Sequence, residues 1–103
     1  LDQYITVNFD NQPVILVGDF NDDLADDPPN NIFEVFLSDS THYRATDMDI
    51  ALGNSADWSY PTWPSHLDHV IITNELFTDF EDDISDIQVI KIEDDMEFKI
   101  DEF

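Results

Sequence analysis

Two short runs of consecutive apolar residues dominate the pattern of the chain, at positions 14–17 (VILV) and 70–72 (VII). Unbroken runs of this length are typical of β-strands that are buried on both faces, because neighbouring strand residues point to opposite sides of the sheet. Gly18 ends the first run, and the second lies within an apolar-rich stretch over 67–73. We therefore predict strands over 14–17 and 67–73, the first of them covered on both faces.

Weaker patterns predict the remaining elements. Apolar residues in positions 1–10 fit helical spacing as well as strand alternation, and we interpret this segment as the end of a helix, followed by a turn at 11–13. Pro28 and Pro29 can open a helix that carries the apolar residues of 32–37. The other expectations are strands over 43–46 and 84–92, one helical turn over 74–77, and irregular structure over 48–60.

Length and composition allow one compact unit. The chain has 103 residues, of which 42% are apolar and 13% aromatic. This is enough apolar material for a core and too much for a disordered acidic tail. Cysteine is absent, which excludes disulfides and thiolate metal sites. No apolar run approaches the roughly 20 residues that span a bilayer, so we expect no membrane span or export signal, and the compartment stays open.

The charge is extreme, because 25 Asp and Glu residues face only Arg44, Lys91 and Lys99, for a formal net charge of -22. Nucleic-acid-binding modules normally present a basic surface that displaces counterions from phosphates. We therefore expect no autonomous nucleic-acid binding by this chain. High salt, bound divalent cations or a basic partner segment are each compatible with such acidity, and charge alone does not choose among them.

The first candidate for chemistry is the motif GDFN, which follows the first predicted strand. Asp19 and Asn21 lie two positions apart and share a side if the segment is extended. A carboxylate at the end of a buried strand needs hydrogen bonds or a nearby cation. An Asx turn is an alternative interpretation. A calcium-binding EF-hand loop is another, although Leu24 and Asn30 stand where that loop needs Gly and Glu.

The second candidate is the motif SHLDHV, at the start of the second predicted strand. Alternation places His66 and Asp68 on one face and His69 on the other. A carboxylate in this position can accept the ring proton of a histidine and fix its tautomer. A purely structural role for the two histidines stays open. Trp63 belongs to an aromatic stretch over 58–63 that either lines a substrate cleft or covers an edge of the core.

Taken together, PVILVGDFND at 13–22 and WSYPTWPSHLDHVIITNELF at 58–77 resemble the endonuclease/exonuclease/phosphatase superfamily. This group of metal-dependent phosphoesterases includes pancreatic-type deoxyribonucleases, abasic-site endonucleases, sphingomyelinases and inositol-polyphosphate phosphatases. Either block alone is a weak match, but both occur in the family's order and at a similar distance.

The resemblance implies an α/β fold, a partial four-layer sandwich of the deoxyribonuclease-like type with two mixed sheets between helices. By this resemblance Asp19 orients or deprotonates the attacking water, Asn21 steadies the phosphate or a metal, and Asp68 pairs with the catalytic histidine. Asp19 and Asn21 are the expected ligands of Mg²⁺, with Mn²⁺ or Ca²⁺ as alternatives. His66 and Trp63 are the expected substrate contacts.

The chain also departs from the family pattern. Only twelve residues precede Pro13, so the metal-binding Asn and Glu motifs that lie upstream of GDFN in the family are missing. The closing SDH motif is missing as well, because Ser85 and Asp86 are followed by Ile87. We therefore expect residues 1–103 to form a single incomplete catalytic domain that is inactive alone.

The leading hypothesis is thus a fragment of a divalent-metal-dependent phosphoesterase that attacks its substrate with activated water. A phosphorylated small molecule, a lipid or a nucleic acid remains open as the substrate. One alternative is a non-enzymatic acidic module that binds Ca²⁺ or cationic partners through Asp22, Asp23, Asp26 and Asp27. Another is a degenerate family member that has kept the fold and lost the chemistry.

Overall fold

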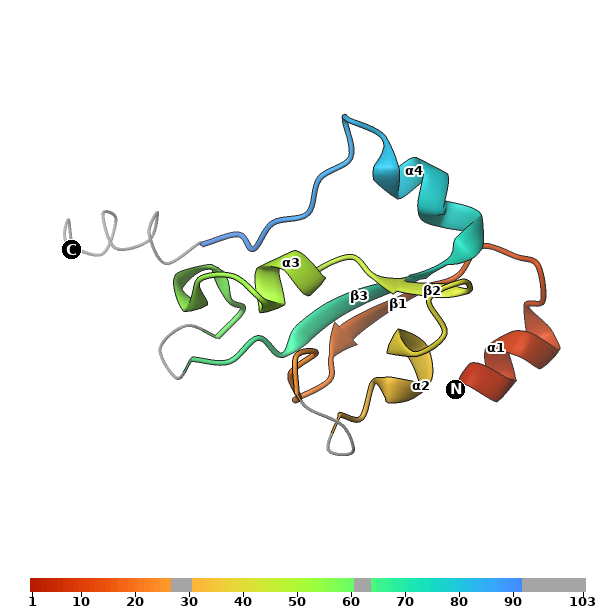
Figure 1. The fold of residues 1–103 in the computed structure, drawn as a ribbon, viewed down its shortest axis with the longest axis horizontal. Coiled ribbons are helices and arrows are strands. Elements are labelled where there is room, and N and C mark those ends of the chain that lie inside the picture. The colour runs from red at the N-terminus through yellow and green to blue at the C-terminus, as the bar shows by residue number, and fades with distance from the viewer. Residues whose placement is uncertain (27–30, 61–63, 92–103) are drawn as a thin grey trace, which may run out of the picture.

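The computed structural model describes residues 1–26, 31–60 and 64–91, and its strands form one antiparallel sheet (Figure 1). The strands are β1 (Ile15–Asp19), β2 (Tyr43–Ala45) and β3 (Asp68–Thr73). Their order is β1-β3-β2, so β3 is central and the other two are edges of the described sheet. The strands predicted over 14–17, 43–46 and 67–73 are therefore confirmed.

Short helices surround the sheet, and Figure 1 shows α2 and α4 on opposite sides of it. The interpretation of the first segment as helical is confirmed by α1. The predicted helical turn at 74–77 is also present, and the helix continues beyond it. The helices are α1 (Asp2–Asn8), α2 (Glu34–Leu37), α3 (Met48–Ala51) and α4 (Phe77–Glu81), with 3₁₀ turns at Ser55–Asp57 and Asn74–Leu76. The chain thus has the expected mixed α/β architecture, consistent with part of the layered sandwich.

One face of the sheet carries the hydrophobic core. Strand alternation points Tyr43 and Ala45 of β2 and Ile71 of β3 to this face. The ring of Phe36 in α2 packs edge-on against Tyr43, with 4.9 Å between the centroids. Helices α1 and α2 and the segment after β1 all contribute to this core, whose buried apolar residues are Ile5, Leu24, Phe33, Phe36, Tyr43, Ala45, Ala51 and Ile71.

The opposite face is covered less completely. Arg44 points there, with its guanidinium 4.5 Å from the ring centroid of Phe77 in α4. Ile15 and Val17 of β1 are 58% and 71% exposed. The prediction that the first strand is buried on both faces is therefore wrong. β1 is an edge strand of the described sheet, and of its apolar side chains Leu16 is the one that packs against the core.

Three other predictions are corrected. The segment 48–60 is not irregular throughout, because it contains α3 and a 3₁₀ turn. Residues 84–91 form no strand, and Ile84 and Ile90 are 92% and 74% exposed, so their apolar pattern does not reflect a buried face. Helix α2 begins only at Glu34, while the prolines expected to open it fall in 27–30, outside the described residues.

Candidate functional site

The sheet register places Asp19 directly opposite Asp68. β1 and β3 are antiparallel, and this pair is the last of their register, at the end of β1 and the beginning of β3. Both side chains are exposed, and both line a pocket of about 340 Å³ that His66 and Asp47 also line. Two negative charges directly opposite each other destabilise a sheet unless a cation lies nearby. Two carboxylates about fifty positions apart in sequence therefore converge on one pocket.

Asn21 departs from the extended geometry expected for GDFN. Its backbone lies in the left-handed region, with φ of 54°, and its N–H donates to Asp19 Oδ1 at 2.9 Å. The strand has ended at Asp19, so the alternation argument does not apply to Asn21. The Asx turn is the interpretation that the structure confirms. Asn21 is exposed and lies two residues after Asp19 in the sequence.

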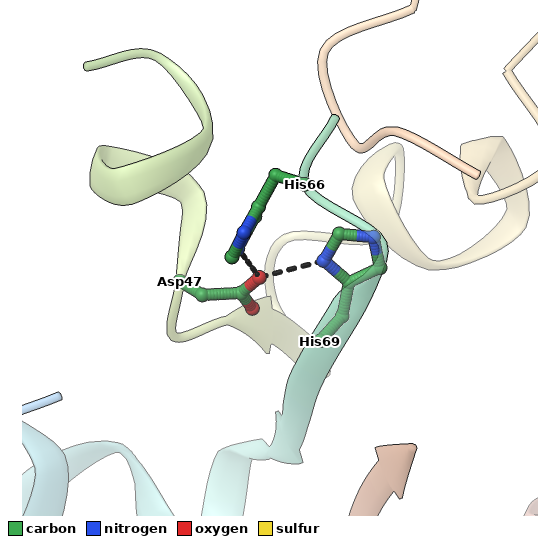
Figure 2. Close-up of side chains that lie close together, drawn as sticks. All are labelled: Asp47, His66 and His69. Atoms are coloured by element: carbon green, nitrogen blue, oxygen red, sulfur yellow. Dashed lines mark hydrogen bonds and ion pairs between the residues drawn. The ribbon is translucent and has the colours of Figure 1, made fainter. Parts of the chain in front are cut away.

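A buried polar cluster, formed by Asp47, His66 and His69, lies beside this pair (Figure 2). Figure 2 shows both imidazoles directed at one carboxylate oxygen, Asp47 Oδ2. His66 Nε2 lies 2.7 Å from that oxygen and His69 Nδ1 lies 2.6 Å from it. The three residues are only 2%, 3% and 1% exposed. Buried polar groups of this kind need hydrogen-bond partners, and each of these side chains has them.

The hydrogen-bond partners fix the protons of the two rings. His69 Nε2 lies 2.6 Å from the carbonyl oxygen of Asp22, and its Nδ1 faces Asp47. Both partners are acceptors, so both nitrogens of His69 carry protons and the ring is an imidazolium. His66 Nδ1 instead accepts the Ser59 N–H at 3.2 Å, so His66 is neutral and donates from Nε2. The cluster holds one negative and one positive charge.

The pKa values of the pair follow from these bonds. Burial alone would raise the pKa of Asp47, but hydrogen bonds from His69, the Val70 N–H and His66 hold it below its ordinary 3.8. Burial alone would lower the pKa of His69, but hydrogen bonds to Asp47 and to the Asp22 carbonyl raise it above its ordinary 6.5. Each charge is thus maintained by the other.

The cluster has donor atoms that could hold a metal ion, because one from each residue lies within 4.8 Å of the others. His69 suits that role, since its Nε2–H already donates to a carbonyl. His66 does not, because a metal at Nε2 would require the proton on Nδ1, where Ser59 already donates. Donor atoms bound to one zinc ion lie about 3.3 Å from each other in tetrahedral geometry. The ring nitrogens of His69 and His66 lie only 2.6 and 2.7 Å from Asp47 Oδ2, which are hydrogen-bond distances. The described arrangement therefore favours protons over a metal.

His66 lines the same pocket as Asp19 and Asp68, but its orientation differs from the expectation. His66 was expected to share a face with Asp68, but it precedes β3, is buried, and uses both ring nitrogens inside the protein. Trp63 falls in 61–63, outside the described residues. Asp23 Oδ1 accepts the His66 N–H at 2.9 Å. Leu24 is 1% exposed in the core, which agrees with the poor match to an EF-hand loop.

Asp47 and Ser59 are absent from the sequence-based candidates. Ser59 Oγ accepts the backbone N–H groups of Leu67 and Asp68, at 2.9 and 3.2 Å, and so anchors the start of β3. The available signal for Asp47 was its place directly after the predicted strand over 43–46. Its partners lie about twenty positions away, and sequence spacing does not identify them.

No curated protein and no solved structure matches the chain. Among the described residues, no helix combines the length and apolar character needed to cross a membrane. The family model described as the Endonuclease/Exonuclease/phosphatase family matches residues 4–89. The match covers most of the chain and includes both GDFN and SHLDHV. The chain therefore belongs to the endonuclease/exonuclease/phosphatase family, a group of divalent-metal-dependent enzymes that act on phosphoesters.

Proposed function

We propose that this chain contributes part of the active site of a divalent-metal-dependent phosphoester hydrolase. The observation that carries the proposal is the register of the sheet, which pairs Asp19 with Asp68 at the rim of one pocket. In this site Asp19 orients the attacking water and accepts its proton. Asn21, held next to Asp19 by the Asx turn, steadies a phosphoryl oxygen or an ion. These roles supply the aligned nucleophile that hydrolysis requires.

Asp68 is proposed to accept a hydrogen bond from the ring N–H of a catalytic histidine. The three histidines of the chain all bind other carboxylates: His66 and His69 bind Asp47, and His42 binds Asp39 at 2.8 Å. The partner of Asp68 would therefore come from outside this sequence. This supports the view of residues 1–103 as an incomplete catalytic domain.

Asp19 and Asn21 are the proposed holders of the divalent ion. Carboxylate and amide oxygens suit Mg²⁺, and also Mn²⁺ or Ca²⁺. The side chains of Arg44 and Lys91 pair with Glu81 and Asp57, so no described salt bridge neutralises the Asp19–Asp68 pair. When bound, the ion would neutralise charge on the phosphoryl oxygens.

Phosphorylated small molecules, lipids and nucleic acids all present the required group, so the proposal extends to phosphoesters as a class. The net charge of -22 disfavours a long polyanion unless another segment supplies cations. The acidic calcium-binding alternative stays a second hypothesis: Asp23 Oδ1 accepts the His66 N–H, and Asp27 lies outside the described residues.

The test measures Mg²⁺-dependent hydrolysis of bis(p-nitrophenyl) phosphate by the gene product that carries this sequence. Asp19→Asn is expected to lower kcat by about 10²- to 10⁴-fold, because it removes the proton acceptor. The matched control is Asp10→Asn, which makes the same charge change at an exposed position outside the pocket. Turnover of Asp19→Asn at the level of that control would refute the assignment.

A further inference from the structure

Asp47 does not cap helix α3, although it occupies the N-cap position. It precedes α3 at the N-cap, where an Asp side chain usually accepts a backbone N–H from the first helical turn, and it makes no such bond. Oδ1 instead accepts the Val70 N–H at 3.1 Å, and Oδ2 accepts from both histidine rings. The side chain is thus directed at the strand that begins with Asp68.

His69 extends this contact to the segment that follows β1. Its Nδ1 donates to Asp47 and its Nε2 donates to the carbonyl of Asp22, which directly follows Asn21. The ring is also stacked on Phe20, with 6.0 Å between centroids. One doubly protonated imidazole therefore joins the GDFN segment to Asp47.

His66 provides a second connection. Its ring donates to Asp47, while its backbone N–H donates to Asp23 Oδ1. The Phe20 N–H adds a bond to the carbonyl of Leu67 at 2.9 Å. The segments 20–23 and 66–70 are therefore joined by direct hydrogen bonds, and both histidine rings of the second segment, together with the Val70 N–H, also bind the single buried carboxylate of Asp47.

We propose that Asp47 is a positioning residue that fixes Asp19 and Asp68 relative to each other, acting through His69 and His66. The inference rests on the proposed function, because this placement serves chemistry only if the two exposed carboxylates act together. Asp47 itself is buried and acts through the imidazoles, so substrate contact is not part of its role.

The test compares Asp47→Asn with Asp49→Asn in the full chain. Asn has nearly the same shape as Asp but carries no charge to balance His69. Asp49 is exposed in α3 and gives the matched loss of charge. The probe is Mn²⁺, followed by the paramagnetic broadening of the Asp19 and Asp68 amide signals. We expect Asp47→Asn to weaken this binding by about tenfold, the lower end of the effect of losing a direct partner of a metal ligand, because Asp47 acts through His69 and Asp22, and Asp49→Asn to leave it unchanged. Equal binding by a folded Asp47→Asn would overturn the inference.

Two metal-free measurements separate this inference from the proposed function. The first is the nuclear Overhauser effect between backbone protons of Asp19 and Asp68, which should weaken in Asp47→Asn and persist in Asp49→Asn.

The second measurement, on the ring protons of His69, needs no variant. At pH 6 the unaltered chain should show both ring N–H protons of His69, slow to exchange, whereas those of the exposed His42 exchange rapidly. A neutral His69 ring would overturn the inference even if Mn²⁺ binds. If Mn²⁺ leaves Asp19 and Asp68 unaffected, the proposed ion site fails, and these two measurements still decide the role of Asp47.

Discussion

The buried carboxylate of Asp47 accepts hydrogen bonds from both histidines and from Val70, so its removal should be costly. We predict that Asp47→Asn lowers the free energy of unfolding by about 3–5 kcal/mol, because it leaves the His69 imidazolium buried without its counter-charge. Urea denaturation near pH 6 measures the change. Asp49→Asn should stay within about 0.5 kcal/mol of the unaltered chain. Equal loss in both variants would show that the cluster carries no special stability.

The same pair should give the stability of the chain a pH optimum. The raised pKa of His69 contributes stability that is complete below its ordinary 6.5 and is lost as the pH rises through the folded-state pKa. The lowered pKa of Asp47 contributes stability above its ordinary 3.8 that is lost as the pH falls through the folded-state pKa. The pair therefore stabilises the folded chain most between about pH 3.8 and pH 6.5. Asp23 also favours the charged ring.

Urea midpoints from pH 4 to 9 check this expectation with His69→Gln as the comparison. The unaltered chain should lose stability above about pH 6.5 more steeply than the variant, because the variant lacks the His69 imidazolium, which loses its proton there, while His42 is common to both. Parallel curves would contradict the charge assignment of His69.

At the residue scale, the sequence indicated the exposed carboxylates and the two buried histidines of the candidate site and missed the buried carboxylate of Asp47 that joins the histidines. Asp19 and Asp68 stand at the ends of apolar runs, and such junctions are visible as a change from apolar to polar residues. Asp47 becomes significant only through contacts with His66 and His69, and these depend on how the strands pair. Pairing is a property of the folded chain that local patterns do not encode.

At the element scale, β3 depends on a side chain that lies before it. Ser59 Oγ accepts the N–H groups of Leu67 and Asp68. We predict that Ser59→Ala costs about 1–3 kcal/mol, because the part-buried Leu67 N–H loses its acceptor, whereas water can replace Ser59 at the exposed Asp68 N–H. Amide hydrogen exchange at Leu67 should accelerate by about tenfold for each 1.4 kcal/mol. Exposed Ser40→Ala is the control, and unchanged exchange in Ser59→Ala would refute the anchoring role.

The elements differ in how well the sequence predicts them. Residues 14–17 and 67–73 were recognisable as strands because an unbroken apolar run needs no partner to be seen. Whether β1 is covered on both faces depends on its edge position, which the run itself does not reveal. Helix α3 spans four residues, about one turn, so it is too short to show a helical period. The pattern over 84–91 alternates as a strand would, yet it lies outside the sheet.

At the scale of the whole molecule, the charge of -22 opposes folding through self-repulsion. We predict that raising NaCl from 0.01 to 1 M raises Tm by several degrees, because the Debye length falls from about 30 Å to about 3 Å. Thermal unfolding followed by circular dichroism measures the shift. Choline chloride at the same ionic strength is the control for specific Na⁺ binding, and a constant or falling Tm in both salts would contradict the repulsion argument.

The left-handed backbone conformation of Asn21 restricts which amino acids fit at this position. β-Branched and bulky residues are disfavoured at this φ, whereas Gly, Asn and Asp are tolerated. Glycine has no side-chain amide, and aspartate would add a third negative charge beside Asp19 and Asp68. Asparagine satisfies both the local conformation and the proposed contact with a phosphoryl oxygen or an ion, so we expect relatives that hydrolyse phosphoesters to keep this amino acid at the position.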